Sequence, residues 1–152
     1  MIRKNFIIHI ALMSILTIHT AIFCEITLAA ERYAISGEIA NIRSGPGTKY
    51  DIFYQAEKYY PVLLIDRSGN WCKIKDFEGD IGWVHKSLVS KIPSIITTSK
   101  KCNIRSGPGT NYDILFVSQR GVPFMVLKRT GKWINIQHSE GYKGWIYESL
   151  TW

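Results

Sequence analysis

Residues 41–48 read NIRSGPGT, and the same eight residues recur at positions 103–110. A proline between two glycines predicts a sharp loop, because Pro46 fixes its own φ and keeps Gly45 extended, while Gly47 is free to take a positive φ. The three residues before the loop alternate in polarity as a strand does. This stretch therefore predicts one strand and one tight loop, twice in the same chain.

The repetition continues from this stretch to residue 152. At an offset of 62 residues, positions 41–90 align with 103–152 without a gap, and 22 of these 50 pairs are identical by direct count. Two copies are too few for a solenoid or a propeller, so each copy has to bury a core of its own. We therefore predict two domains, at residues 31–90 and 96–152, joined by a linker at residues 91–95.

Within one copy, the sequence predicts short strands separated by turns. Residues 59–65 (YYPVLLI) are rich in β-forming side chains, and a Ser-Gly-Asn turn follows them. The next residues alternate, which places Cys72 and Ile74 on one face of a strand and Trp71 and Lys73 on the other. No segment after residue 30 shows a sustained helical period. We therefore expect an all-β chain made of two tandem small barrels with about five short strands each.

Residues 1–30 have the three-part pattern of a secretory signal peptide. Arg3 and Lys4 precede an apolar run at residues 7–24, and two small residues, Ala29 and Ala30, follow it. A retained membrane anchor is the alternative, because the apolar run is just long enough to span a bilayer. We predict cleavage after the second alanine, which gives an exported protein, periplasmic or secreted, with no stable membrane span afterwards.

The chain is basic, with 19 Lys and Arg against 12 Asp and Glu and a formal net charge of +7. This balance favours anionic partners, such as cell-wall polymers, membrane surfaces or nucleic acid. The basic residues are spread along the chain rather than clustered, which equally fits an ordinary solvated surface. On this ground we do not expect a nucleic-acid partner.

The motifs of the two copies resemble a known family. Each copy carries N-x-R-S-G-P-G-T-x-Y, then G-x-W-x-x-I, and finally G-W-V or G-W-I with Ser-Leu shortly after. This pattern resembles the bacterial SH3 (SH3b, SH3 type 3) domain, and the resemblance covers nearly all of residues 33–152. It implies a strongly bent SH3-like barrel in each copy. It also implies a targeting or binding role, often toward peptidoglycan or its stem peptides.

The candidate ligand contacts are six aromatic residues at matching positions of the two copies: Trp71, Trp133, Tyr50, Tyr112, Trp83 and Trp145. Trp71 and Trp133 rank first, because strand alternation turns them away from the predicted core. An exposed tryptophan offers a ligand an apolar platform and one directional N–H. The other four follow the Gly-Pro-Gly loops or come late in each copy, and the SH3 arrangement brings such segments to one groove. Trp83 and Trp145 have an alternative role as core rings.

Two cysteines, Cys72 and Cys102, remain after removal of residues 1–30. An exported protein with an even number of cysteines allows a disulfide. Each of these cysteines, however, stands where the sister copy has an apolar residue, Ile134 or Ala40, at an inward-facing position. Thiols in two different cores lie too far apart to pair. We therefore favour free thiols over a disulfide.

The two copies contain no motif typical of catalysis, a metal site or a cofactor site. The Gly-Pro-Gly loops lack the Lys-Ser/Thr of a phosphate-binding loop, and no Cys/His spacing fits a closed metal site. His85 and His138 are the two histidines after residue 30, and no nucleophile motif lies near either. We expect a non-enzymatic cell-envelope module that binds peptidoglycan or its peptides. The alternative is a periplasmic protein–protein interaction adaptor.

Overall fold

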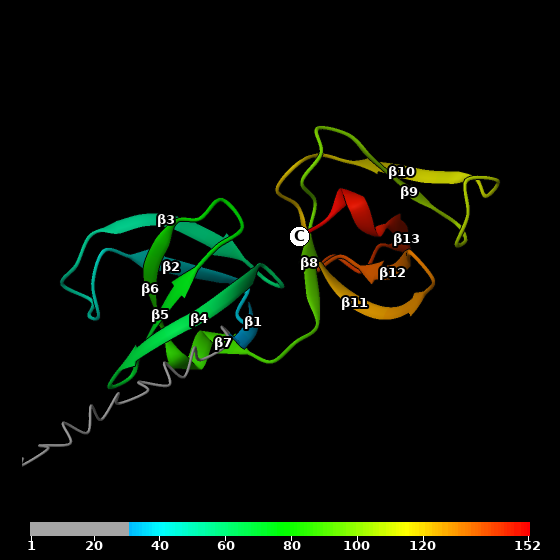
Figure 1. The fold of residues 1–152 in the computed structure, drawn as a ribbon. Coiled ribbons are helices and arrows are strands. Elements are labelled where there is room, and N and C mark those ends of the chain that lie inside the picture. Colours follow the sequence, from blue (N-terminus) through cyan, green and yellow to red (C-terminus); the bar gives the residue numbers. More distant parts are fainter. Residues whose placement is uncertain (1–30) are drawn as a thin grey trace, which may run out of the picture.

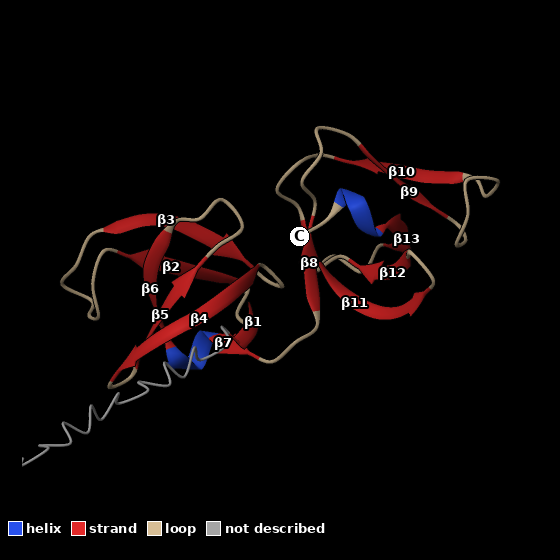
Figure 2. Ribbon diagram, viewed as in Figure 1, coloured by secondary structure: helices blue, strands red, loops and turns tan. Residues whose placement is uncertain are grey.

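The computed structural model describes residues 31–152, so the predicted signal peptide at residues 1–30 lies outside the described residues. Strands dominate the described part, and its two 3-10 helices have three residues each. The strands form two separate sheets (Figures 1 and 2). The predicted all-β class is therefore confirmed. No helix among residues 31–152 is long and apolar enough to cross a membrane.

The first copy forms a seven-stranded antiparallel sheet with the order β3-β2-β6-β5-β4-β1-β7. Its elements are β1 (Glu31–Ile35), β2 (Ile39–Arg43), β3 (Ile52–Glu57), β4 (Pro61–Ser68), β5 (Trp71–Lys75), β6 (Ile81–His85), the 3-10 helix η1 (Lys86–Leu88) and β7 (Val89–Ser90). The sheet has more strands than the five expected, because β3 and the short β7 also pair. β1 precedes the Gly-Pro-Gly stretch and adds to β4, and β3 follows the loop and returns along β2.

The second copy forms a six-stranded antiparallel sheet with the order β10-β9-β13-β12-β11-β8. Its elements are β8 (Ser94–Ile96), β9 (Cys102–Arg105), β10 (Ile114–Ser118), β11 (Pro123–Thr130), β12 (Trp133–Gln137), β13 (Lys143–Tyr147) and the 3-10 helix η2 (Glu148–Leu150). The order matches the first sheet strand for strand. The counterpart of the β1–β7 pair is a single bridge between Thr97 and Thr151. The 62-residue repeat of the sequence is therefore also a repeat of the pairing.

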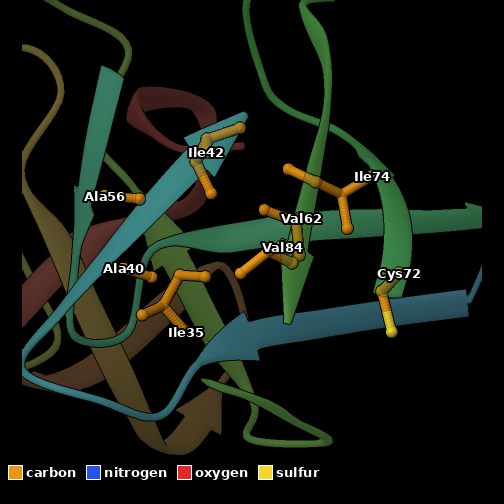
Figure 3. Close-up of a cluster of buried hydrophobic side chains, with 8 residues drawn as sticks. All are labelled: Ile35, Ala40, Ile42, Ala56, Val62, Cys72, Ile74 and Val84. Carbon is orange, nitrogen blue, oxygen red and sulfur yellow. The ribbon is translucent and has the colours of Figure 1, made fainter. Parts of the chain in front are cut away.

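The core of the first copy lies on the inward faces of its strands. Cys72 and Ile74 are fully buried, as the alternation predicts, while Trp71 and Lys73 face the other way and are half-buried. Figure 3 shows the buried side chains, which come from all of β1 to β6: Ile35, Ala40, Ile42, Ala56, Val62, Cys72, Ile74 and Val84. Burial of each Ile or Val stabilises the fold by about 1.5–3 kcal/mol relative to an exposed side chain.

The second copy has a separate core, richer in isoleucine and with a phenylalanine that the first core lacks. Its buried cluster consists of Ile95, Cys102, Ile104, Phe124, Ile134, Ile136 and Ile146. Cys72 belongs to the first cluster and Cys102 to the second, and both are buried free thiols. Burial raises the pKa of the Cys102 thiol, which disfavours its reactive thiolate form.

A short connection joins the two sheets, since β7 ends at Ser90 and β8 begins at Ser94. β8 lies on the side of the second sheet that faces the first, in contact with β4 (Figure 1). Side chains also meet across this junction. Arg120 forms an ion pair with Glu78 at 2.7 Å, and the guanidinium of Arg32 lies 4.1 Å above the ring of Trp152.

Candidate functional site

An arginine closes each Gly-Pro-Gly loop. In the second copy, Nη1 of Arg105 donates a hydrogen bond to the carbonyl oxygen of Tyr112 at 2.8 Å. In the first copy, Nη1 of Arg43 donates to the carbonyl of Tyr50 at the same distance and to that of Thr48 at 3.2 Å. The invariant Arg of the repeated NIRSGPGT stretch is therefore a brace that holds the loop ends together, so it is not a free cation at the surface.

The tyrosine after each loop packs on the loop itself. A Cβ atom on Gly107 would lie 2.3 Å from the ring of Tyr112, and one on Gly45 would lie 2.5 Å from the ring of Tyr50. The two glycines are thus required by the close approach of the rings. Both tyrosines keep one side at the surface, with exposed fractions of 37% for Tyr50 and 43% for Tyr112. The packing of these two rings on the glycines therefore shapes the Gly-Pro-Gly loop.

Each first-ranked tryptophan forms an aromatic pair on the face opposite the core. The ring of Trp133 meets Tyr147 edge to face, with centroids 5.3 Å apart. In the first copy, Trp71 meets His85 in the same way at 5.5 Å. The partners are directly opposite across the β12–β13 and β5–β6 pairs. Both tryptophans are half-buried, which leaves part of each ring free for a ligand.

In the second copy, this aromatic pair and the braced loop border one groove. The groove has a volume of about 710 Å³. It is lined by side chains of β9, β12, β13 and η2 together with the loop: Lys101, Asn103, Arg105, Gly109, Thr110, Asn111, Trp133, Tyr147, Ser149 and Leu150. Trp133 therefore lies beside the Gly-Pro-Gly loop, as the SH3 resemblance implies. The groove at this position is the main candidate site.

Trp83 and Trp145 lie on the outer face and outside both core clusters. Val84 and Ile146, the next residues, supply the core side chains instead. Nζ of Lys73 lies 5.9 Å from the ring centroid of Trp83, and Nζ of Lys128 lies 5.2 Å from that of Trp145. Trp145 is only 8% exposed, so neighbours on the outer face cover it. Trp145 is thus a buried ring although it lies outside the core cluster, Trp83 is half-buried, and the lysines reduce the access of a ligand to both rings.

A second pocket, in the first copy, was not anticipated from the sequence. It has a volume of about 580 Å³ and is lined by Phe53, Tyr54, Tyr60, Asp76, Glu78, Asp80 and Ile81. Asp76 is 4% exposed and accepts hydrogen bonds from the hydroxyls of Tyr54 at 3.0 Å and Tyr60 at 3.2 Å. Its other oxygen accepts the backbone N–H groups of Glu78 and Asp80. Burial and the Asp76 charge raise the pKa of both tyrosines well above the usual range.

The equivalent pocket of the second copy has different chemistry. At an offset of 62 residues, His138 replaces Asp76 and Phe116 replaces Tyr54. The pocket shrinks to about 250 Å³, and the ring of His138 packs edge to face on Phe124 at 5.5 Å. The alignment of the two copies already contains this difference, because these two pairs of residues are not identical. The two copies are therefore not equivalent as binding modules.

The two histidines among residues 31–152 have local structural partners. Nδ1 of His85 lies 2.8 Å from the hydroxyl of Ser87 and accepts the backbone N–H of the same residue, which caps η1. His138 accepts the backbone N–H of Glu140 in a turn. Among residues 31–152, no group of three or more His, Cys, Asp or Glu side chains is placed to hold a metal ion.

Comparison with known proteins identifies the family. The sequence model of the bacterial SH3 domain matches residues 36–91 and matches again at residues 98–152. The chain belongs to the bacterial SH3 domain family. The matches cover β2 to β7 of the first sheet and β9 to β13 of the second, so this SH3 protein carries the domain twice.

Its relatives include a protein of Bacillus subtilis (strain 168) named as an N-acetylmuramoyl-L-alanine amidase, YrvJ. The two are 30% identical over 137 residues, which is 82% of the SH3 protein and 26% of YrvJ. A protein of Staphylococcus epidermidis named as a cell wall amidase, LytH, is 35% identical over 52 residues, which is 34% of this chain and 18% of LytH. The SH3 protein thus spans about a quarter or less of these relatives.

Solved structures of low identity also align with the SH3 protein. NlpC2 from Trichomonas vaginalis matches with a TM-score of 0.37 and 15% identity, over 81% of this chain and 48% of that one. An NlpC/P60 family protein from Bacillus cereus ATCC 10987 matches with a TM-score of 0.39 and 13% identity, over 80% of this chain and 56% of that one.

Proposed function

We propose that this SH3 protein is a non-enzymatic cell-envelope module that binds peptidoglycan or its peptides through the groove at Trp133. The observation that carries the proposal is the groove itself. It joins an aromatic corner, made by Trp133 and Tyr147, to a loop whose shape is fixed by Arg105. A preformed apolar corner with a few polar groups at its edge is the usual form of a small-ligand site.

The lining of the groove suits a peptide with attached sugar. The perpendicular rings of Trp133 and Tyr147 offer an apolar corner to a methyl group or a sugar face. Asn103 supplies an amide that both donates and accepts hydrogen bonds, and Lys101 supplies an ammonium for a carboxylate. The stem peptides of peptidoglycan carry small side chains, amides and carboxylates, which are the groups that this set can recognise.

The names of the relatives support an envelope role. Both YrvJ and LytH are named as amidases, one of them of the cell wall, and the matched part of each is a minor share of its length. In this proposal the SH3 pair corresponds to their targeting portion. The predicted signal peptide at residues 1–30 would then carry the protein to the periplasm or the exterior, where its ligand lies.

The absence of catalysis is part of the proposal and rests on how the polar side chains are used. In the described part of the chain, both histidines have local partners: His85 contacts Ser87 as a helix cap, and His138 packs against Phe124. Both thiols, of Cys72 and Cys102, are buried. A nucleophile needs an adjacent base and access to substrate, and these four groups lack that combination.

The alternative function, a periplasmic protein–protein adaptor, is favoured by the edge strands. β3 and β10 stand at the ends of the two sheets and expose large apolar side chains. Phe53 is 61% exposed and Leu115 is 55% exposed. An extended segment of another protein can add to such an edge by backbone hydrogen bonds.

The test is a titration of purified muropeptides into the protein, followed by tryptophan fluorescence. We expect a saturable change that Trp133→Ala abolishes. Trp71→Ala is the matched control, because it removes the equivalent ring from the first copy, where His85 replaces Tyr147, and we expect at least half of the signal to remain. No change with the wild-type protein, or the same change with Trp133→Ala, would remove this site. Retention on whole murein in moderate salt separates binding from simple charge attraction.

A further inference from the structure

A cavity distinct from the three described above lies where the two copies meet. This junction cavity has a volume of about 740 Å³. Its walls come from β1, from the connection after β7, from β8 and β11, and from the last residues of the chain. The residues that carry its chemistry are Arg32, Lys91, Pro93, Arg129, Glu148 and Trp152.

Positive charge dominates the junction cavity. Arg32 on β1, Lys91 in the connection and Arg129 on β11 line it, against one acidic side chain, that of Glu148. Four ion pairs occur within residues 31–152, and Lys91 takes part in one of them, with Glu31 at 2.9 Å. Neither arginine takes part in any of the four. The guanidinium groups of Arg32 and Arg129, which come from different copies, therefore line the cavity without forming an ion pair with a carboxylate.

The two arginines are held close enough to affect each other. The guanidinium carbon of Arg32 lies 4.1 Å above the ring of Trp152, a cation–π contact that fixes its position. Partial burial, and then the nearby charge of Arg129, lower the pKa of Arg32. Two like charges that line one cavity repel each other, and an anion bound between them attracts both.

We propose that the junction cavity binds the phosphate group of an anionic ligand, between the guanidinium groups of Arg32 and Arg129. A carboxylate is satisfied by one guanidinium fork, whereas a phosphate has oxygens that accept from several directions at once. The cationic groups of Arg32, Lys91 and Arg129 reach the cavity from three separate segments, which matches the several directions from which a phosphate accepts hydrogen bonds. Pro93 and Trp152 leave an apolar wall for the organic part of a phosphate ester.

The site belongs to the pair of domains and is absent from a single copy. At the 62-residue offset, the counterpart of Arg129 is Arg67, which donates a hydrogen bond to the hydroxyl of Tyr33 at 3.2 Å. The counterpart of Arg32 is Ser94, which has no charge. The tandem arrangement therefore builds a site that the family fold alone does not provide.

The experiment titrates inorganic phosphate and glycerol phosphate into the ¹⁵N-labelled protein and follows the indole N–H signals, with Trp152→Phe to identify that of Trp152. We expect a saturable shift of the Trp152 signal. Arg129→Gln should raise the half-saturation concentration about tenfold or more, the loss of one charged hydrogen bond. Arg129→Lys should retain part of the binding. Lys49→Gln removes a charge from a distant loop and should change it less than about twofold.

Each outcome decides the proposal. An unmoved Trp152 signal, an unchanged half-saturation in Arg129→Gln, or an equal response to acetate would overturn it. Arg129 is exposed, so the variant should keep a dispersed amide spectrum, and Arg32→Gln provides a second test. Vesicles of phosphatidylglycerol, compared with phosphatidylcholine, then distinguish the sources. If the protein is retained on phosphatidylglycerol vesicles and Arg129→Gln abolishes this retention, the ligand is a lipid headgroup. If the protein binds glycerol phosphate but is not retained on the vesicles, the ligand is a soluble phosphate ester.

Discussion

Nη2 of Arg120 donates hydrogen bonds to both carboxylate oxygens of Glu78, at 2.7 and 2.9 Å, and joins the two SH3 copies. The same guanidinium lies 5.3 Å from the ring centroid of Phe77 and also donates to the carbonyl of Thr98. The counterpart of Arg120 in the first copy is Lys58, which pairs with Glu38 inside its own copy. At this position of the repeat, only the residue of the second copy, Arg120, therefore reaches across the junction.

Arg120→Ala should loosen the junction with little loss of stability. Both side chains of the ion pair are nearly half exposed, so the pair contributes less than about 1 kcal/mol. The relative alignment of the two copies, measured by residual dipolar couplings, should nevertheless become averaged. Lys58→Ala is the control and should leave the alignment unchanged. Identical couplings in Arg120→Ala and the wild type would show that other contacts fix the junction.

Gly107→Ala should destabilise the second copy, because the added Cβ would lie 2.3 Å from the ring of Tyr112. Such overpacking costs about 1–3 kcal/mol, which urea unfolding can measure. Adding Tyr112→Ala removes the ring that the methyl group meets. The double variant should then lose less than the sum of the single variants, and strict additivity would contradict the proposed contact.

Stability should fall at alkaline pH because of Tyr54 and Tyr60. Their folded pKa values are raised by burial and by Asp76, above the unfolded value of about 10. The stabilisation is fully present below about pH 10 and is lost as the pH rises toward the folded pKa values. Urea unfolding at pH 8 and pH 11 should show this loss. The Tyr54→Phe, Tyr60→Phe variant should show a smaller one, and an equal loss would assign the effect elsewhere.

Cys72 and Cys102 should both be free thiols in the purified protein. Each is buried in its own core cluster, so neither should react with iodoacetamide under native conditions. In urea without reductant, mass spectrometry should show both residues modified. A disulfide-linked peptide that contains the two cysteines would contradict this expectation.

The sequence alone predicts the elements that depend on local pattern. The 62-residue repeat, the tight loop and the inward direction of Cys72 and Ile74 follow from residue order, because side chains alternate along any strand. The same alternation identified Trp71 and Trp133 as facing away from the core. It did not reveal the cover over Trp145, because Lys128 reaches that ring from another strand.

The tertiary structure decided the sites. Asp76 meets Tyr54 and Tyr60 from 22 and 16 residues away, and no local pattern links these three side chains. The junction cavity and the Arg120–Glu78 pair require both copies in contact, which neither copy encodes by itself. Sequence periodicity thus determined two SH3 folds and their outward faces. Which outward residues meet was settled only by packing, because contact between distant segments depends on the position of every strand between them.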